Sequence, residues 1–112
     1  MRHFAVWAPF AQERVDLVAD GDRTPMVLVA DEGPDNGLWV IDADVPAEVR
    51  YGYSLDGGSV LPDPRGIHLP DGPHGLNETY DLDAFEWSDQ GWQGARLQGS
   101  VLYELHIGTF TS

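Results

Sequence analysis

The segment from Val101 to Thr111 most constrains what this chain can fold into, because it has the pattern of a β-strand that is apolar on both faces. Val101, Tyr103 and Leu105 alternate onto one face, while Leu102 lies on the other. Such a strand is typical of a parallel sheet that is covered on both sides, and it needs neighbouring strands of the same kind. The preceding sequence supplies none. We therefore expect residues 101–112 to be the first strand of a larger structure that is truncated here.

Composition and charge narrow the class of protein. The chain has 112 residues, which suits one domain with a single core. Lys and Arg total 6 against 19 Asp and Glu, a formal net charge of -13, so we expect no binding to nucleic acid or to anionic membranes. There is no cysteine for a disulfide or a thiolate metal site, and no apolar run spans a bilayer. We expect a cytoplasmic protein.

Short apolar runs, broken by Gly, Pro, Asp and Asn, occupy the first sixty residues and favour an antiparallel β-sandwich. Apolar alternation predicts six strands, near residues 3–8, 14–19, 26–29, 39–41, 49–55 and 60–61, and we expect the first two to pair with each other. Tight turns are predicted at Asp20-Gly21-Asp22 and at Asp56-Gly57-Gly58. The spacing predicts an immunoglobulin-like sandwich over residues 1–80, with its large aromatic residues in the core: Trp7, Trp39, Tyr51 and Tyr53.

Residues 61–78 form a Pro- and Gly-rich loop in this prediction. Loops longer than about 12 to 15 residues are usually either functional or disordered. Leu61, Ile67 and Leu69 indicate that this loop packs on something. Residues 81–100, with Phe85 and Trp87 among acidic residues and glycines, are expected to be an aromatic-anchored connector.

Five segments carry a resemblance that runs almost end to end: Phe4–Pro9 (FAVWAP), Gly37–Trp39 (GLW), Tyr51–Gly57 (YGYSLDG), Leu61–Gly75 (LPDPRGIHLPDGPHG) and Tyr103–Thr111 (YELHIGTFT). Together they resemble the amino-terminal region of the maltooligosyltrehalose trehalohydrolases, a family of the α-amylase superfamily. Glycogen branching enzymes share the opening strand and the Tyr-Glu-Xaa-His strand, and are the nearest alternative. Gly66 and Ile67 depart from the family, which more often carries Ser-Arg there.

The resemblance implies an early-set β-sandwich over residues 1–80, a connector over 81–100 and the first strand of a truncated β/α barrel over 101–112. It also implies a parent enzyme that hydrolyses the α-1,4 bond next to trehalose with retention of configuration. Retaining glycosidases use two carboxyl groups about 5 Å apart. In this superfamily they sit at the ends of later barrel strands, as in barrel enzymes generally. We therefore expect no catalytic residue, no metal and no cofactor site in this chain.

The loop is our main candidate for contact with substrate in the parent enzyme. A proline-stiffened segment can hold polar groups with little loss of entropy on binding, and this one carries Arg65, His68, Asp71 and His74. Phe110, just past the predicted barrel strand, is a further candidate. An equally plain alternative is that the loop only docks the domain onto the barrel. Glu104 and His106 share a strand face, for which we expect a structural hydrogen bond in preference to a metal pair.

The expected partner is the catalytic barrel of the same protein, with α-glucan or maltooligosyl trehalose as ligand. A stand-alone α-glucan-binding module is the alternative function, and an unrelated adhesion sandwich is a third. Without a barrel, the segment 101–107 is expected to be disordered, or to pair with a sandwich edge or with a second molecule, because unpaired strands recruit partners. A strand-mediated homodimer is one such outcome.

Overall fold

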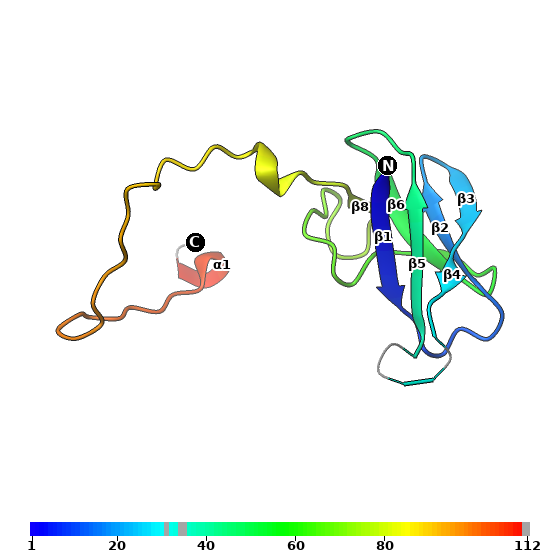
Figure 1. The fold of residues 1–112 in the computed structure, drawn as a ribbon, viewed down its shortest axis with the longest axis horizontal. Coiled ribbons are helices and arrows are strands. Elements are labelled where there is room, and N and C mark those ends of the chain that lie inside the picture. Colours follow the sequence, from blue (N-terminus) through cyan, green and yellow to red (C-terminus); the bar gives the residue numbers. More distant parts are fainter. Residues whose placement is uncertain (31, 34–35, 111–112) are drawn as a thin grey trace.

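The computed structural model describes residues 1–30, 32–33 and 36–110, and in these ranges the strands form two antiparallel sheets (Figure 1). The smaller sheet has the order β1 (Arg2–Trp7), β5 (Leu38–Ala43), β4 (Val27–Leu28). The larger has the order β3 (Asp22–Pro25), β2 (Val15–Ala19), β6 (Arg50–Leu55), β7 (Val60–Leu61), and β8 (Asn77–Glu78) also pairs with β6. This architecture confirms the predicted all-β domain, while its assignment to the immunoglobulin-like class stays a prediction.

The core lies between the two sheets, and both contribute to it. Phe4, Val6 and Trp39 come from the smaller sheet, while Leu17 and Tyr53 come from the larger. The Tyr53 hydroxyl donates a 3.4 Å hydrogen bond to the carbonyl oxygen of Ala5, so it links the two layers directly. Trp39, Tyr51 and Tyr53 are buried as predicted. The prediction for Trp7 is wrong, because its side chain is 66% exposed.

Two strand predictions need correction. β1 pairs with β5, and β2 pairs with β3 and β6, so the first two strands lie in different sheets instead of pairing. Alternation shows which face of a strand is buried. It does not show whether two strands are neighbours in one sheet or lie in opposite sheets, because both arrangements bury those faces in the same core. The strand predicted at Met26–Val29 is divided: β3 ends at Pro25, Met26 is buried, and β4 joins the other sheet.

Both predicted tight turns are present. Asp20 and Gly21 have φ of 52° and 88° and connect β2 to β3, a pattern that suits a two-residue hairpin. Asp56 and Gly57 have φ of 50° and 75° between β6 and β7. These positions need a left-handed backbone, which Gly and Asp tolerate best.

The Asp56 carboxylate fastens the turn after β6 to the segment that enters β2. It accepts hydrogen bonds from the backbone N–H groups of Gln12, Glu13 and Arg14, at 2.9, 2.8 and 3.1 Å. Hydrogen bonds of this kind favour the ionised carboxylate, and they hold the pKa of Asp56 below its ordinary value.

The strand expected at Val101–Ile107 is not formed. No described strand pairs with this segment; residues 101–106 have no regular structure, and α1 (Ile107–Phe110) is a single helical turn. A strand needs a neighbour to satisfy its backbone groups, and none lies beside it. Thr111 and Ser112, the end of the predicted strand, lie outside the described residues.

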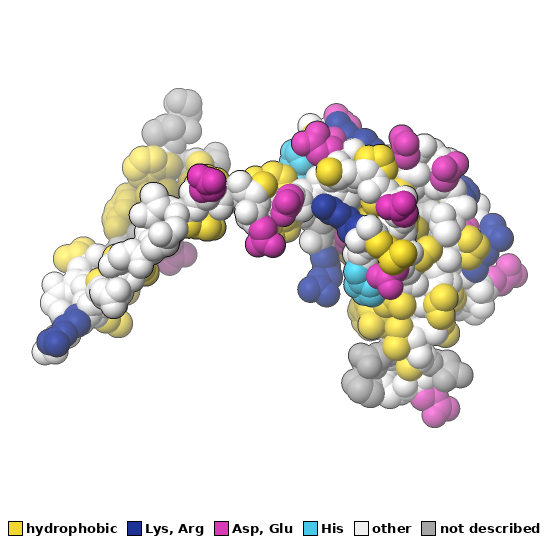
Figure 2. Space-filling model, turned by 45° about the horizontal axis from the view of Figure 1, so that its top comes forward, with side chains coloured by type: hydrophobic (Ala, Val, Ile, Leu, Met, Phe, Trp, Pro, Cys, Tyr) yellow, Lys and Arg dark blue, Asp and Glu magenta, His cyan; other side chains and the backbone are white. Residues whose placement is uncertain are grey.

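Every described residue from Tyr80 to Phe110, hereafter the tail, is exposed. Its only other regular element is the 3₁₀ turn η1 (Leu82–Ala84), whose first turn is capped by the Asp81 carboxylate. The tail leaves the sandwich next to β8 and runs away from it (Figure 1). Hydrophobic side chains lie open along it, while carboxylates are scattered over the sandwich (Figure 2).

Asp56→Asn tests whether the Asp56 carboxylate stabilises the fold through its hydrogen bonds to residues 12–14. Because the folded pKa lies below the unfolded value of about 3.9, ionised Asp56 stabilises the fold above that pH, and the contribution is lost as pH falls through the folded pKa. We expect the variant to be less stable than the unaltered chain at neutral pH, and to lose less stability than that chain on acidification. Urea unfolding from about pH 7 to about pH 2 measures both. Asp22→Asn, at an exposed position of β3, is the control. Equal acid sensitivity of parent and Asp56→Asn would contradict this role.

Candidate functional site

The loop predicted at residues 61–78 is held at both ends by one edge of β6. β7 pairs Leu61 with Tyr53, and β8 pairs Asn77 with Tyr51, so the two short strands lie end to end along that edge. The intervening residues therefore leave the sheet beside Tyr53 and return to it beside Tyr51, two residues nearer the start of β6. Because both ends of the loop are anchored on the same strand, the loop packs on the sandwich.

Asp63 is the centre of a hydrogen-bond cluster that holds the loop, and we call Asp63, Tyr51 and Asn77 the Asp63 cluster. The Tyr51 hydroxyl donates to Asp63 Oδ2 at 2.9 Å, and the backbone N–H of Arg65 donates to Oδ1 at 2.8 Å. The backbone N–H of Asp63 in turn donates to Asn77 Oδ1 at 2.6 Å. Burial, and then the hydrogen bond to Asp63, raise the pKa of Tyr51, so this hydroxyl stays a donor at neutral pH.

Gly66 makes room for the buried side chain of Asn77. A Cβ atom at Gly66 would overlap the side-chain amide of Asn77, which is fully buried. The departure from the Ser-Arg pattern at residue 66 thus has a local steric reason in this chain, while nothing in the structure explains Ile67. The Asn77 side-chain nitrogen has no hydrogen-bond partner among the described residues, while its oxygen is used by Asp63.

Two of the predicted site residues meet through partners that the sequence analysis missed. Arg50 on β6 forms an ion pair with Asp71 and, through Nε, a second with Glu78 Oε2 at 3.0 Å. His68 Nδ1 lies 3.3 Å from Glu78 Oε1 but is not aligned for a hydrogen bond. Arg50 and Glu78 are directly opposite each other in the pairing of β6 with β8. Only that register could have revealed them.

The other predicted residues are not part of this charged group. Arg65 is exposed and lies nearer β1, while His74 is exposed and has no hydrogen bond or ion pair with a described residue. Phe110 lies in α1, and the structure does not bring it to the loop (Figure 1). Glu104 and His106 are exposed in the tail. These five residues therefore do not form one site in this structure.

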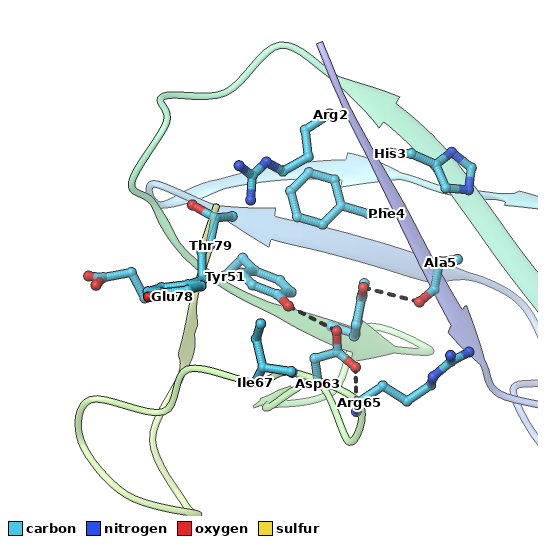
Figure 3. Close-up of a pocket in the computed structure, with 13 residues that line it drawn as sticks. Arg2, His3, Phe4, Ala5, Tyr51, Asp63, Arg65, Ile67, Glu78 and Thr79 are labelled. Carbon is cyan, nitrogen blue, oxygen red and sulfur yellow. Dashed lines mark hydrogen bonds between the residues drawn. The ribbon is translucent and has the colours of Figure 1, made fainter. Parts of the chain in front are cut away.

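A polar pocket of about 370 Å³ lies between β1 and the loop (Figure 3). Arg2 and Arg65 lie on opposite sides of the pocket, and the Asp63 side chain extends from the loop to the Tyr51 hydroxyl. Neither arginine forms an ion pair with a described residue, so both guanidinium groups are available as donors. Tyr80, where the tail begins, also lines this pocket. The pocket can offer hydrogen bonds to a polar ligand, and none of its lining residues is an activated nucleophile.

In the described part of the chain, no group of three or more His, Asp or Glu side chains is arranged to hold a metal ion. Likewise, none of the helices seen there has the length and apolar character needed to cross a membrane.

Gly66→Ala tests the close contact with Asn77. Since φ at Gly66 is not in the left-handed region, the added methyl acts by overlap alone, and we expect a loss of about 1–3 kcal/mol in the free energy of unfolding, measured with urea. Gly91→Ala is the matched control, because a Cβ at Gly91 meets no atom within 4 Å. Unchanged stability of Gly66→Ala would show that the loop does not pack as described.

Comparison with known proteins gives relatives over nearly the whole chain, although no protein-family model matches it. A malto-oligosyltrehalose trehalohydrolase of Rhizobium sp. (strain M-11) is 52% identical over 111 residues, and one of Saccharolobus solfataricus is 37% identical over 111 residues; the matches cover 96% and 97% of this chain. A 1,4-alpha-glucan branching enzyme of Bacillus caldolyticus is 35% identical and covers 96% of this chain. The chain spans 18% of the length of each of these relatives.

The fold has a relative among solved structures. The crystal structure of a putative alpha amylase from Salmonella typhimurium matches 97% of this chain with a TM-score of 0.83 and 30% identity, and the chain covers 18% of it. The predicted resemblance is thereby confirmed. Trehalohydrolases match this chain at 37 to 52% identity in several organisms, above the branching enzyme at 35%. By sequence, the chain is similar to malto-oligosyltrehalose trehalohydrolases, and it spans just under one fifth of their length.

Proposed function

We propose that this chain is the noncatalytic amino-terminal domain of a trehalose-releasing glycoside hydrolase, which packs on a catalytic barrel and shapes its substrate cleft. The observation that carries the proposal is the tail. Its apolar residues, from Leu82 to Phe110, are exposed throughout, whereas a protein that works alone rarely leaves a large apolar surface open. The tail suits a segment whose place is inside a larger structure.

The side chains of the polar pocket support a binding role over a catalytic one. A retaining glycosidase needs one carboxylate free to attack and a second that can donate a proton. In the pocket, the Asp63 carboxylate accepts hydrogen bonds from Tyr51 and Arg65, and Glu78 is paired with Arg50. Both carboxylates are thus engaged in holding the loop. We infer that the catalytic carboxylates belong to another part of the parent enzyme.

The loop is suited to shape a cleft because the sandwich holds its backbone in place. The Asp63 cluster fixes its beginning and its end, and the Arg50 ion pair with Asp71 fixes its far side. A loop held in this way can present Arg65 and His74 to a sugar without ordering cost. Asp71 would then act mainly by holding the loop through Arg50, and His68 by its backbone carbonyl oxygen, which accepts a 3.0 Å hydrogen bond from the N–H of Glu78.

An α-glucan-binding module is the second candidate, and one observation favours it. Phe85 and Trp87 pack together in the tail with their ring centroids 4.8 Å apart, and 59% and 66% of these side chains are exposed. Exposed aromatic rings can stack on pyranose rings. The two rings are at 73° to each other, however, so they do not form a flat tandem platform.

A titration with maltoheptaose separates the two functions. Tryptophan fluorescence of the chain is expected to show no saturation up to millimolar ligand, because a cleft-shaping domain contributes only part of a sugar site. Trp87→Ala is measured in parallel. Saturation at sub-millimolar ligand that is lost in Trp87→Ala would favour the binding module and contradict our proposal.

A chimera tests the domain role itself. Residues 1–112 would replace the matching amino-terminal region of the Rhizobium sp. relative, with the remainder of that enzyme left intact. We expect trehalose release from maltooligosyl trehalose within about tenfold of the intact relative, equivalent to about 1.4 kcal/mol in the barrier. The relative without its amino-terminal region is the control. A chimera no more active than this control would contradict the proposed function.

A further inference from the structure

The sandwich carries an apolar groove of about 520 Å³ along the end of β1. Its walls are the end of β1 with the turn after it, the end of β6, and β7 with the beginning of the loop; the exposed side chains among them include Trp7, Phe10 and Leu61. We propose that this groove is the surface on which the catalytic remainder of the parent enzyme docks. The inference rests on the proposed function and assigns the contact to one face of the domain.

The groove differs from the rest of this surface in charge. The chain carries 6 basic and 19 acidic residues, yet none of the charged side chains that the structure describes lines the groove. The polar pocket at the start of β1, by contrast, is lined by Arg2, Asp63, Arg65 and Glu78. An apolar concavity of this kind on a strongly acidic protein marks a contact site.

Hydrogen bonds position the ring of Trp7 and the backbone of Phe10 before any partner arrives. The indole Nε1 of Trp7 donates a 2.9 Å hydrogen bond to the carbonyl oxygen of Asn36, which orients a ring that is 66% exposed. The carbonyl oxygen of Phe10 accepts a hydrogen bond from the Gln12 side chain, and Asp56 binds the backbone N–H of Gln12. Rigid aromatic anchors bind with little loss of entropy. The solvent-facing Trp7 is therefore a prepared contact residue.

The position of the tail identifies the occupant. The groove and the polar pocket lie in succession along β1 and share Tyr53 in their walls, and Tyr80, where the tail starts, lines the polar pocket. The polypeptide that follows the sandwich therefore starts at the pocket next to the groove. The relatives carry most of their length outside the 18% that this chain spans, so a large covalently linked partner is available there.

A second exposed apolar strip, on β4 and the residue after it, is a competing surface and provides the control. Val27 and Val29 are 65% and 49% exposed. β4 is at the edge of the smaller sheet opposite β1, so this strip lies away from the start of the tail.

The test uses the chimera with the remainder of the Rhizobium sp. relative. Phe10→Ser with Leu61→Ser is expected to separate the unfolding of the sandwich from that of the barrel in calorimetry, and to raise the rate of proteolysis in residues 81–100 at least about tenfold. Val27→Ser with Val29→Ser is expected to change neither. In the isolated 112-residue chain, all four changes lie on exposed side chains, and the same midpoint of thermal unfolding in both double variants would show that the sandwich stays folded.

The outcomes separate the inference from the proposed function. If the unaltered chimera is active but the two double variants behave alike, the groove is not the docking face and the inference is overturned. If the unaltered chimera is inactive and its two parts unfold independently, the proposed function fails, and the inference with it. Light scattering on the isolated chain covers the other occupant: a dimer abolished by Phe10→Ser would assign the groove to a second copy and overturn the inference.

Discussion

The return of the chain to one edge of β6 is the constraint on which the rest of this domain depends. β7 and β8 occupy successive positions on that edge, and the Asp63 cluster ties the residues between them to the core residue Tyr51. Neither strand is long enough to be stable alone, since each makes only two residue pairs with β6. Side-chain hydrogen bonds to buried partners supply what the short ladders lack, and they hold the loop as part of the sandwich.

Carboxylates have two separate roles in this acidic chain. Most are scattered over the surface, where they favour solubility. Asp56 and Asp63 instead accept hydrogen bonds from backbone N–H groups of loops, and so replace strand pairing where the chain turns. Buried Asp16 lies between Arg14 and Arg23, at 3.3 and 3.8 Å, which keeps its charge compensated.

The region between β1 and the loop combines two neighbouring surfaces of opposite character. The polar pocket offers hydroxyl groups and two arginines that pair with no described residue, as a surface next to a sugar would. The apolar groove offers the ring of Trp7, which a hydrogen bond orients, beside other apolar side chains, as a surface against another domain would. Their succession along a single strand gives a physical form to the two roles we propose, which are packing on a barrel and shaping its cleft.

The sequence by itself determined the all-β class, both tight turns and the long loop, because alternation and left-handed Asp-Gly positions are local properties. It also indicated the resemblance to trehalohydrolases, which the similarity to those relatives confirms. Only the tertiary structure decided that β1 and β2 belong to different sheets, that Trp7 points outward, and that Asp71 and His68 meet through Arg50 and Glu78. These outcomes depend on which strands become neighbours and in what register. The segment at 101–107 shows the same limit, because a strand pattern becomes a strand only where a partner completes its hydrogen bonds.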